Sequence, residues 1–341
     1  MRFIPVCLSL LAACAFTGAA RAQGVEEFWR GRTISLVVGS SPGGGYDTMA
    51  RAVSRHLGKH VPGKPQVVVR NMPGAGSIAA TSFIAKLAPR DGLTIGLVQN
   101  NAPFEPLVGT KEADYDPTRI TWLGAPSVEV GLLIAWGGSK FRTLDDARRM
   151  EMTIGSSGAN GTPAFFARLL ASVFDLKLKI SPGYPGQNEA WIAMERGELD
   201  GYGLTFWSSL AAGKPDWVRD KKVNMLLQFG PEREAALADV PYGPDLVTKA
   251  EDKVFFEAGY ASLKAGRPFL APPDVPADRV AALRAAMNAT FADPEFLAEV
   301  ARLQMPVDKP STGEEMQALI KRIYALPPAV IERLRKMAQN Y

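Results

Sequence analysis

The stretch ISLVVGSSPGGGYD, residues 34–47, decides the fold of this chain. Its first five residues predict a buried strand, and three consecutive glycines then precede a polar helix start. Glycines at such a turn let a ligand approach the backbone closely. In a parallel α/β sheet this loop lies at the carboxyl end of a strand, where the free N–H groups of the next helix attract anions. The stretch therefore predicts an anion-binding edge.

The same pattern of strand, glycine-containing loop and helix recurs along the chain. Loop 71–77 follows a strand at 66–69, and in the second half loops 155–163 and 181–187 follow strands near 152–154 and 176–180. Four such loops in two sets predict two lobes that face each other across a cleft. A length of 341 residues also favours two domains over one.

We expect each lobe to be a β-α-β-α-β unit, closed into a mostly parallel sheet by right-handed crossovers and flanked by helices. The fold class is therefore α/β, with the ligand cleft between the lobes. The predicted division of the chain is residues 24–124 with 231–341 for the first lobe and 125–230 for the second. The expected strands are 34–38, 66–69, 93–98, 152–154, 176–180, 199–202 and 255–261, with crossing segments at 120–123, 130–136 and 223–229. The expected helices are 47–60, 77–87, 164–174 and 188–196, then helices from 277, 294 and 312 that pack back on the first lobe.

The N-terminus has the pattern of a secretory signal. Arg2 precedes an apolar run at 3–17, and Ala-Arg-Ala at 20–22 fits a cleavage site, so we expect residues 1–22 to be removed and the mature protein to be periplasmic. An alternative is lipidation at Cys14, because LAAC at 11–14 resembles a lipobox. The only other cysteine is Cys7, so no disulfide is expected in the mature chain. The formal net charge of +4 includes two arginines of the leader, and the remaining +2 is too weak to indicate nucleic-acid binding.

The sequence motifs that would indicate an enzyme or a cofactor site are incomplete in this chain. GAGSIA at 74–79 matches a dinucleotide fingerprint loosely, but it follows the second strand and lacks the expected acidic partner. Ala159 stands where a nucleophile elbow needs glycine. His56 and His60 lie four residues apart with no apparent third ligand, which favours a solvated helix face over a metal site. We therefore expect no cofactor, no metal and no catalytic residue.

Five motifs occur in a fixed order along the chain: SPGGGYDTMAR at 41–51, VRNMPGAG at 69–76, APRDG at 88–92, YPGQ at 184–187 and MERGELDG at 194–201. In this set of motifs the chain resembles the solute-binding receptors of tripartite tricarboxylate transporters. The resemblance implies a two-lobed periplasmic-binding-protein-like receptor that closes on a small organic carboxylate and delivers it to a two-subunit membrane permease. We expect a monomer. An exported enzyme acting on a carboxylate ester or amide, and a sensor that reports to a membrane kinase, stay open as alternatives.

Three departures from the family pattern concern the ligand. Phe165-Phe166 stands where many relatives carry His, Gln187-Asn188 replaces a glycine pair, and Tyr46 is bulkier than the usual residue. A citrate-like ligand is therefore not assumed.

The candidate ligand contacts come from the loops at the strand ends, with Tyr46, Tyr184 and Trp207 as possible walls of the site. Asp47 has two interpretations, a helix cap or a ligand contact. In the first lobe the candidates are Ser41, Gly43, Gly44, Tyr46, Asp47, Pro73, Gly74, Ala75, Gly76, Ser77 and Asn100. In the second lobe they are Ser156, Gly158, Asn160, Gly161, Thr162, Tyr184, Gly186, Gln187 and Trp207.

Overall fold

The structure is a computed structural model that describes residues 24–159, 161–305 and 307–339. The expected signal peptide at 1–22, the lipobox cysteine Cys14 and the candidate contact Asn160 lie outside the described residues. Within these ranges, none of the helices combines the length and the apolar character that crossing a membrane requires.

The first lobe is built on a six-stranded sheet in the order β11-β4-β10-β3-β1-β2. β1 lies in parallel between β2 and β3, and β10 pairs antiparallel with both β3 and β4. The carboxyl ends of β1, β2 and β3 therefore share one edge, as the loop pattern predicts. The strands are β1 (Thr33–Val38), β2 (Gln66–Asn71), β3 (Thr94–Leu97), β4 (Thr121–Ala125), β10 (Phe269–Ala271) and β11 (Ser311–Thr312).

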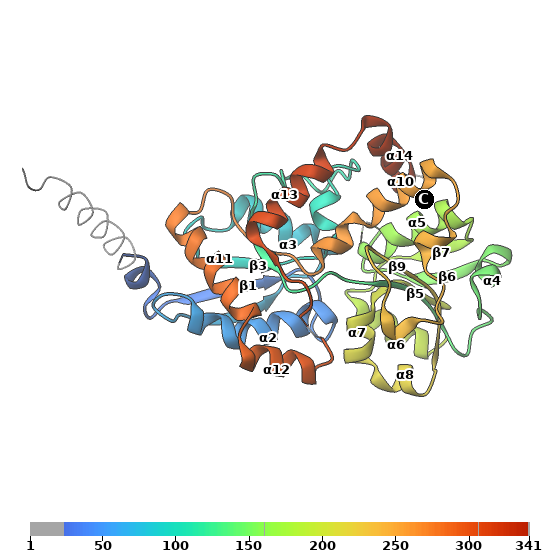
Figure 1. Ribbon diagram of the computed structural model, residues 1–341, viewed down its shortest axis with the longest axis horizontal. Helices are drawn as coiled ribbons and strands as arrows, with labels where there is room; N and C mark the ends of the chain where they lie inside the picture. The colour runs from blue at the N-terminus through green and yellow to red at the C-terminus, as the bar shows by residue number, and fades with distance from the viewer. Residues whose placement is uncertain (1–23, 160, 306, 340–341) are drawn as a thin grey trace, which may run out of the picture.

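Helices cover both faces of this sheet (Figure 1). On one face α11 and α12 pack against α2, whose buried residues recur at helical spacing. On the other face α13 packs on β4, beside the short helices that follow β2. The helices are α2 (Gly45–His60), η1 (Ala75–Ser77), α3 (Ile78–Ser82), η2 (Phe83–Leu87), η3 (Ala102–Phe104), α11 (Ala277–Phe291), α12 (Pro294–Arg302) and α13 (Gly313–Tyr324).

The second lobe repeats the plan with five strands in the order β7-β6-β8-β5-β9. β6 pairs in parallel with β7 and β8, while β5 runs antiparallel between β8 and β9. Segments 130–136 and 223–229, expected to be crossings, are the sheet strands β5 and β9. The elements are β5 (Gly131–Trp136), α4 (Leu144–Arg149), β6 (Met152–Gly155), α5 (Thr162–Phe174), β7 (Leu178–Ser181), α6 (Gln187–Glu195), β8 (Gly201–Phe206), α7 (Trp207–Gly213), α8 (Pro215–Arg219), β9 (Val223–Phe229), η4 (Ala235–Leu237) and α9 (Gly243–Leu246).

The expected strand at 255–261 is wrong, because these residues end the helix α10 (Ala250–Tyr260) and begin η5 (Ala261–Ala265). Phe255, Phe256, Gly259 and Tyr260 are buried at helical spacing, so the run of aromatics forms the buried face of a helix and is not a strand of the sheet. α10 packs against α5 and α14 (Pro328–Gln339), and α14 also contacts α5. Part of segment 231–341 thus lies against the second lobe (Figure 1), although the prediction gave all of it to the first.

Candidate functional site

A cleft lies between the lobes at the carboxyl ends of the parallel strands. It encloses about 470 Å³ between the atoms of the two lobes, counting the solvent at its mouth. The first lobe contributes Ser40, Ser41, Gly44, Gly45, Tyr46 and Gln99, and the second contributes Thr162, Pro163, Gly186, Gln187, Tyr202, Leu204, Phe206 and Ser209.

Three helices begin at this cleft. The N-cap residues of α2, α5 and α6 are Gly44, Gly161 and Gly186, and none of them supplies a side-chain cap. The first N–H groups of a helix have no partner within it, and together with the helix dipole they favour an anion. A glycine cap therefore leaves the first donors of α2 in one lobe and of α6 in the other to whatever enters the cleft. At α5 the N–H of Thr162 is already donated to Gln99, and Pro163 has no N–H.

The floor of the cleft is apolar and comes from one strand. Tyr202, Leu204 and Phe206 of β8 all line the cleft. The pairing of β8 with β5 shifts register between Tyr202 and Thr205, and Tyr202 packs in a different apolar cluster from Leu204 and Phe206. The ring of Tyr46 lies with its centroid 5.9 Å from that of Phe206 and packs against apolar clusters of both lobes. Burial raises the pKa of Tyr46 and of Tyr202, so both phenols stay neutral.

The two lobes are in direct contact, so the cleft is closed. Gln99 of the first lobe accepts the N–H of Thr162 at 3.0 Å and donates to Ser157 Oγ at 3.1 Å. Ser41 Oγ donates to the carboxylate of Glu189 at 3.0 Å. These bonds join residues that are more than fifty positions apart in the sequence, and only a closed arrangement of the lobes permits them.

Two glycines make this contact possible. A Cβ placed on Gly45 would lie 2.1 Å from Ser209 Oγ, and a Cβ on Gly186 would lie 2.1 Å from Ser41 Oγ. Real Cβ contacts stay above 3.0 Å, so a side chain at either glycine would collide with the opposite lobe. Both positions require glycine for the approach of the lobes, since neither backbone has a positive φ.

The candidates that line the cleft are Ser41, Gly44, Tyr46, Thr162, Gly186 and Gln187. Gln187 is notable because its side-chain nitrogen is buried and has no hydrogen-bond partner among the described residues, while its oxygen accepts from Thr205 at 3.2 Å. A buried donor without a partner is costly, so it favours a ligand acceptor at this place.

Asp47 is held inside the first lobe and does not line the cleft. Its carboxylate accepts the N–H of Gly43 at 3.0 Å, the side chain of Arg51 at 2.8 Å and the amide of Asn71 at 2.8 Å. Burial acts to raise the pKa of this carboxyl, but these hydrogen bonds outweigh it and lower the pKa. Asp47 is thus the third residue of α2 and secures the glycine loop, while Gly44 is the N-cap.

Several other candidates form hydrogen bonds with residues that line the cleft. Ser77 donates to the carbonyl of Gly39 at 2.7 Å and accepts the N–H of Gln99 at 3.0 Å. Asn100 donates its N–H to the hydroxyl of Tyr46 at 3.1 Å, and its side-chain oxygen accepts from Thr162 at 3.2 Å. These residues position lining groups, although they do not line the cleft themselves.

The remaining candidates lie around the cleft. Gly158 faces the loop of the first lobe, since a Cβ on it would be 3.5 Å from the nitrogen of Gly76 and 3.6 Å from Ala75. Pro73 and Gly74 are exposed in that same loop. Ser156 donates to the carbonyl of Gly158, and Gly161 caps α5. Gly43 borders a neighbouring groove. Tyr184 and Trp207 are half-buried against the apolar cluster of the second lobe.

Sequence reasoning missed more than half of the lining. Gln99 could have been found, because it follows the third strand directly, as Asn100 does. The residues of β8 and α7 carried no motif. The missed lining residues are Ser40, Gly45, Gln99, Pro163, Tyr202, Leu204, Phe206 and Ser209. Within this lining there is no histidine, cysteine or carboxylate that could serve as an acid, base or nucleophile.

The two histidines have carboxylate neighbours that the sequence did not reveal. His56 Nε2 lies 2.7 Å from Glu299, and His60 Nε2 lies 2.8 Å from Asp293, so α2 and α12 are joined by polar pairs. The expected solvated helix face is therefore wrong: His56 and His60 are largely buried under α12, because α12 packs along α2.

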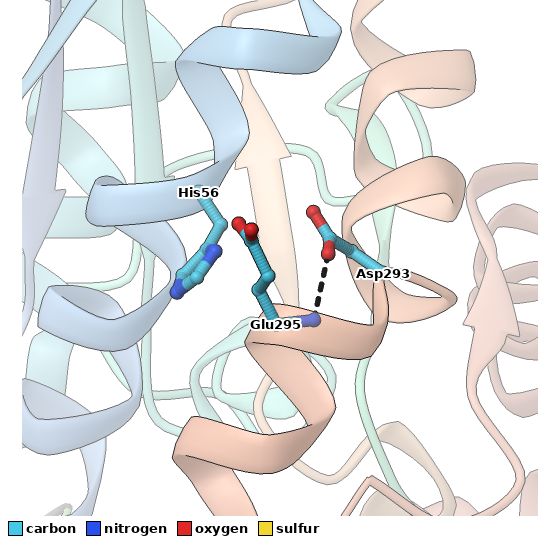
Figure 2. A group of neighbouring side chains, drawn as sticks. All are labelled: His56, Asp293 and Glu295. Atoms are coloured by element: carbon cyan, nitrogen blue, oxygen red, sulfur yellow. Dashed lines mark hydrogen bonds between the residues drawn. The ribbon is translucent and has the colours of Figure 1, made fainter.

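His56, Asp293 and Glu295 lie close enough to be considered as metal ligands (Figure 2). The backbone N–H of Glu295 donates to Asp293 there, as a helix cap. However, the ammonium of Lys59 lies 2.5 Å from Asp293 and 2.6 Å from Glu295. Its hydrogen bond is the largest cause that lowers the pKa of Asp293. Lys59 thus already supplies the positive charge that a metal ion would bring.

Comparisons with known proteins agree with this geometry. Residues 49–334 match the profile of the tripartite tricarboxylate transporter family receptor, TctC. A UPF0065 protein from the gbd 5' region of Cupriavidus necator is 28% identical over 245 residues, covering 68% of this chain and 70% of that protein. A UPF0065 protein from the tcbD-tcbE intergenic region of Pseudomonas sp. (strain P51) is 29% identical over 204 residues, covering 57% of this chain and 58% of its relative's length.

Solved structures show the same fold. The periplasmic binding protein BugD superposes with a TM-score of 0.70 at 20% identity, covering 91% of this chain and 98% of BugD. MatC from Rhodopseudomonas palustris with bound malate gives a TM-score of 0.69 at 19% identity, with 91% and 99% covered. The α/β fold of two lobes is therefore confirmed, and the chain belongs to the tripartite tricarboxylate transporter family of receptors.

Proposed function

We propose that this protein captures a small organic carboxylate between its lobes in the periplasm and delivers it to a two-subunit membrane permease. The observation that carries the proposal is the convergence of three glycine-capped helix N-termini, from both lobes, on one closed cleft. Only the closed form brings both sets of donors to one ligand, so an anion that binds both sets selects that form.

The chemistry of the lining favours an acid with a short apolar body. Gln99, Gln187 and the serines offer neutral polar groups, whereas Tyr202, Leu204 and Phe206 offer an apolar floor. MatC was solved with malate, and a second protein of the same fold, Rpa4515 of R. palustris (TM-score 0.71, 18% identity), was solved with adipate; both ligands are of this class. Among the described residues that line the cleft there is no histidine, cysteine or carboxylate, which favours capture and release over turnover.

The test is a thermal-shift screen of the mature protein with malate, succinate, adipate, benzoate and acidic amino acids, followed by calorimetry. A ligand at about 100 times its Kd should raise the free energy of unfolding by about 2.7 kcal/mol. The matched control is the diamide of the best acid, which keeps its length and removes its charge. Recovery of the unaltered acid after incubation would support a receptor. Equal binding of acid and diamide, or no shift with any acid, would contradict the proposal.

A further inference from the structure

A buried cation lies directly behind the cleft. Arg267, in the segment between η5 and β10, is fully buried, and its guanidinium forms an ion pair with the buried carboxylate of Glu129. The ring centroids of Phe206 and Tyr46, both lining residues, lie 5.0 and 5.8 Å from its guanidinium carbon. Its charge therefore acts on the cleft through a low-dielectric layer of aromatic carbon.

Arg267 donates to two neighbouring serines at the start of α7. The same guanidinium nitrogen lies 2.7 Å from Ser209 Oγ and 3.0 Å from Ser208 Oγ. A hydroxyl has one proton to donate, and an acceptor role toward Arg267 leaves that proton free for another partner. Ser208 gives its proton to Glu129, at 2.7 Å.

The hydroxyl proton of Ser209 has no comparable acceptor among the described residues. Among the contacts of the described chain, Ser209 accepts from Arg267 and donates to no other residue, and its side chain lines the cleft beside Gly45 at the start of α2. Ser208, which shares the same donor, does not line the cleft. The two serines thus differ in the use of their hydroxyl protons: Ser208 donates to Glu129, whereas the hydroxyl of Ser209 faces the space where a ligand would bind.

We infer that Arg267 is a positioning residue that fixes the hydroxyl of Ser209 as a hydrogen-bond donor for an anionic group of the ligand. The inference rests on the proposed function and deepens it. The ligand group would lie beside Ser209, where its hydroxyl meets the N-terminus of α2, with the arginine charge one hydroxyl away. A carboxylate is the chemical group that suits a donor polarised in this way, whereas an amide or an alcohol gains less from it.

The adjacent serines provide a matched experiment. Ser209→Ala and Ser208→Ala remove the same atom from consecutive residues of α7, and each removes one bond to Arg267. The probe is whichever of malate, succinate and adipate binds the wild-type protein most tightly in calorimetry. We expect Ser209→Ala to weaken binding of that probe by about tenfold or more, as for loss of a hydrogen bond to a charged group, and Ser208→Ala to change it by less than about threefold.

A second pair of variants tests the role of Arg267. Arg267→Lys keeps the positive charge beside Glu129 but loses the planar fork that reaches Ser209. If Arg267 acts through Ser209, the double variant Arg267→Lys/Ser209→Ala should bind the probe no more weakly than Arg267→Lys alone. A purely structural arginine would instead give additive losses.

The outcomes distinguish a failure of the proposed function from a failure of the role of Ser209. If none of the three acids binds the wild-type protein, the proposed function fails and this inference falls with it. If the wild-type protein binds a probe and Ser209→Ala binds it equally well, or if both serine variants lose affinity to the same extent, only the role of Ser209 is overturned. Should Arg267→Lys fail to fold, the two serine variants still decide the question.

Discussion

A single methyl group at Gly45 should hold the lobes apart. Gly45 begins α2 in the first lobe, and its added Cβ would lie 2.1 Å from Ser209 Oγ and 3.0 Å from Ser209 Cβ in the second lobe. A rotation of the serine side chain would relieve the first contact but not the second, and the guanidinium of Arg267 at 3.1 Å limits the space further. Alanine itself suits a helix better than glycine, so Gly45→Ala should not weaken the first lobe.

The size of the effect follows from the cost of overpacking. Inserting a methyl group into a packed contact typically costs about 1–3 kcal/mol. Because only the closed form engages the ligand from both sides, this cost should weaken the affinity for an acid by about 5- to 150-fold. The melting temperature without ligand should stay close to that of the wild-type protein, since the open form accommodates the methyl group.

Gly44→Ala is the companion variant. One residue earlier, the added Cβ would lie 3.9 Å from the nearest atom of the second lobe, Gln187 Cβ, which is an ordinary contact. Small-angle scattering should therefore show wild-type closure for Gly44→Ala and a more open average for Gly45→Ala. A loss of affinity in Gly44→Ala with closure intact would report a blocked approach of the ligand. Wild-type affinity together with wild-type scattering for Gly45→Ala would refute the reasoning.

Three further predictions concern buried polar side chains of the first lobe. Gln99→Ala removes the acceptor of Thr162 N–H and the donor to Ser157. Calorimetry should therefore show that the acid binds more weakly, by about 1–3 kcal/mol. Unchanged affinity for the acid would exclude a role for these two bonds in closure. Burial raises the pKa of Glu105 to about 7 from 4.5. Its contribution to the free energy of unfolding should therefore fall by up to about 3 kcal/mol as the pH rises from 4.5 to 7. Chemical denaturation of Glu105→Gln should lack this pH dependence of the free energy of unfolding. The lowered pKa of Asp47 means that its stabilisation is present above pH 3.8 and lost as the pH falls, so Asp47→Asn should melt below the wild-type protein at pH 7, with a gap that narrows below pH 3.8.

The sequence predicts the parts of the fold that depend on local pattern. The strand-loop-helix units around Gly44, Gly161 and Gly186 are found where expected, because glycine loops at strand ends have few alternative structures. The helix α10 was mistaken for a strand because a short aromatic run fits both periodicities, and only its packing against α5 decides between them.

In the candidate site, too, the residues of a local sequence pattern were predicted and those placed by tertiary contacts were missed. Loop residues such as Ser41 and Gln187 line the cleft as expected, whereas Ser209 was missed because it lies in a short helix with no motif. Its position depends on Arg267, 58 residues away along the chain. Asn100 was chosen and Gln99 was not, although both follow the third strand, because the sequence does not show which of these side chains lines the cleft.

The placement of Arg267 behind Ser209 explains how a closed cleft can hold an anion without an exposed charge of its own. An arginine facing the cleft directly would lose its hydration on closure, and without ligand it would lie buried and unpaired, which is costly. Here Glu129 compensates the charge, and both side chains of the pair are buried. In the closed arrangement the lining presents neutral donors such as Ser209 and Gln187 to a ligand, while Ser41 donates to the carboxylate of Glu189 where the lobes meet. Selectivity for an acid would thus depend on oriented hydroxyl and amide protons, and neutralising Arg267 together with Glu129 should reduce the preference for an acid over its diamide more than it reduces closure itself.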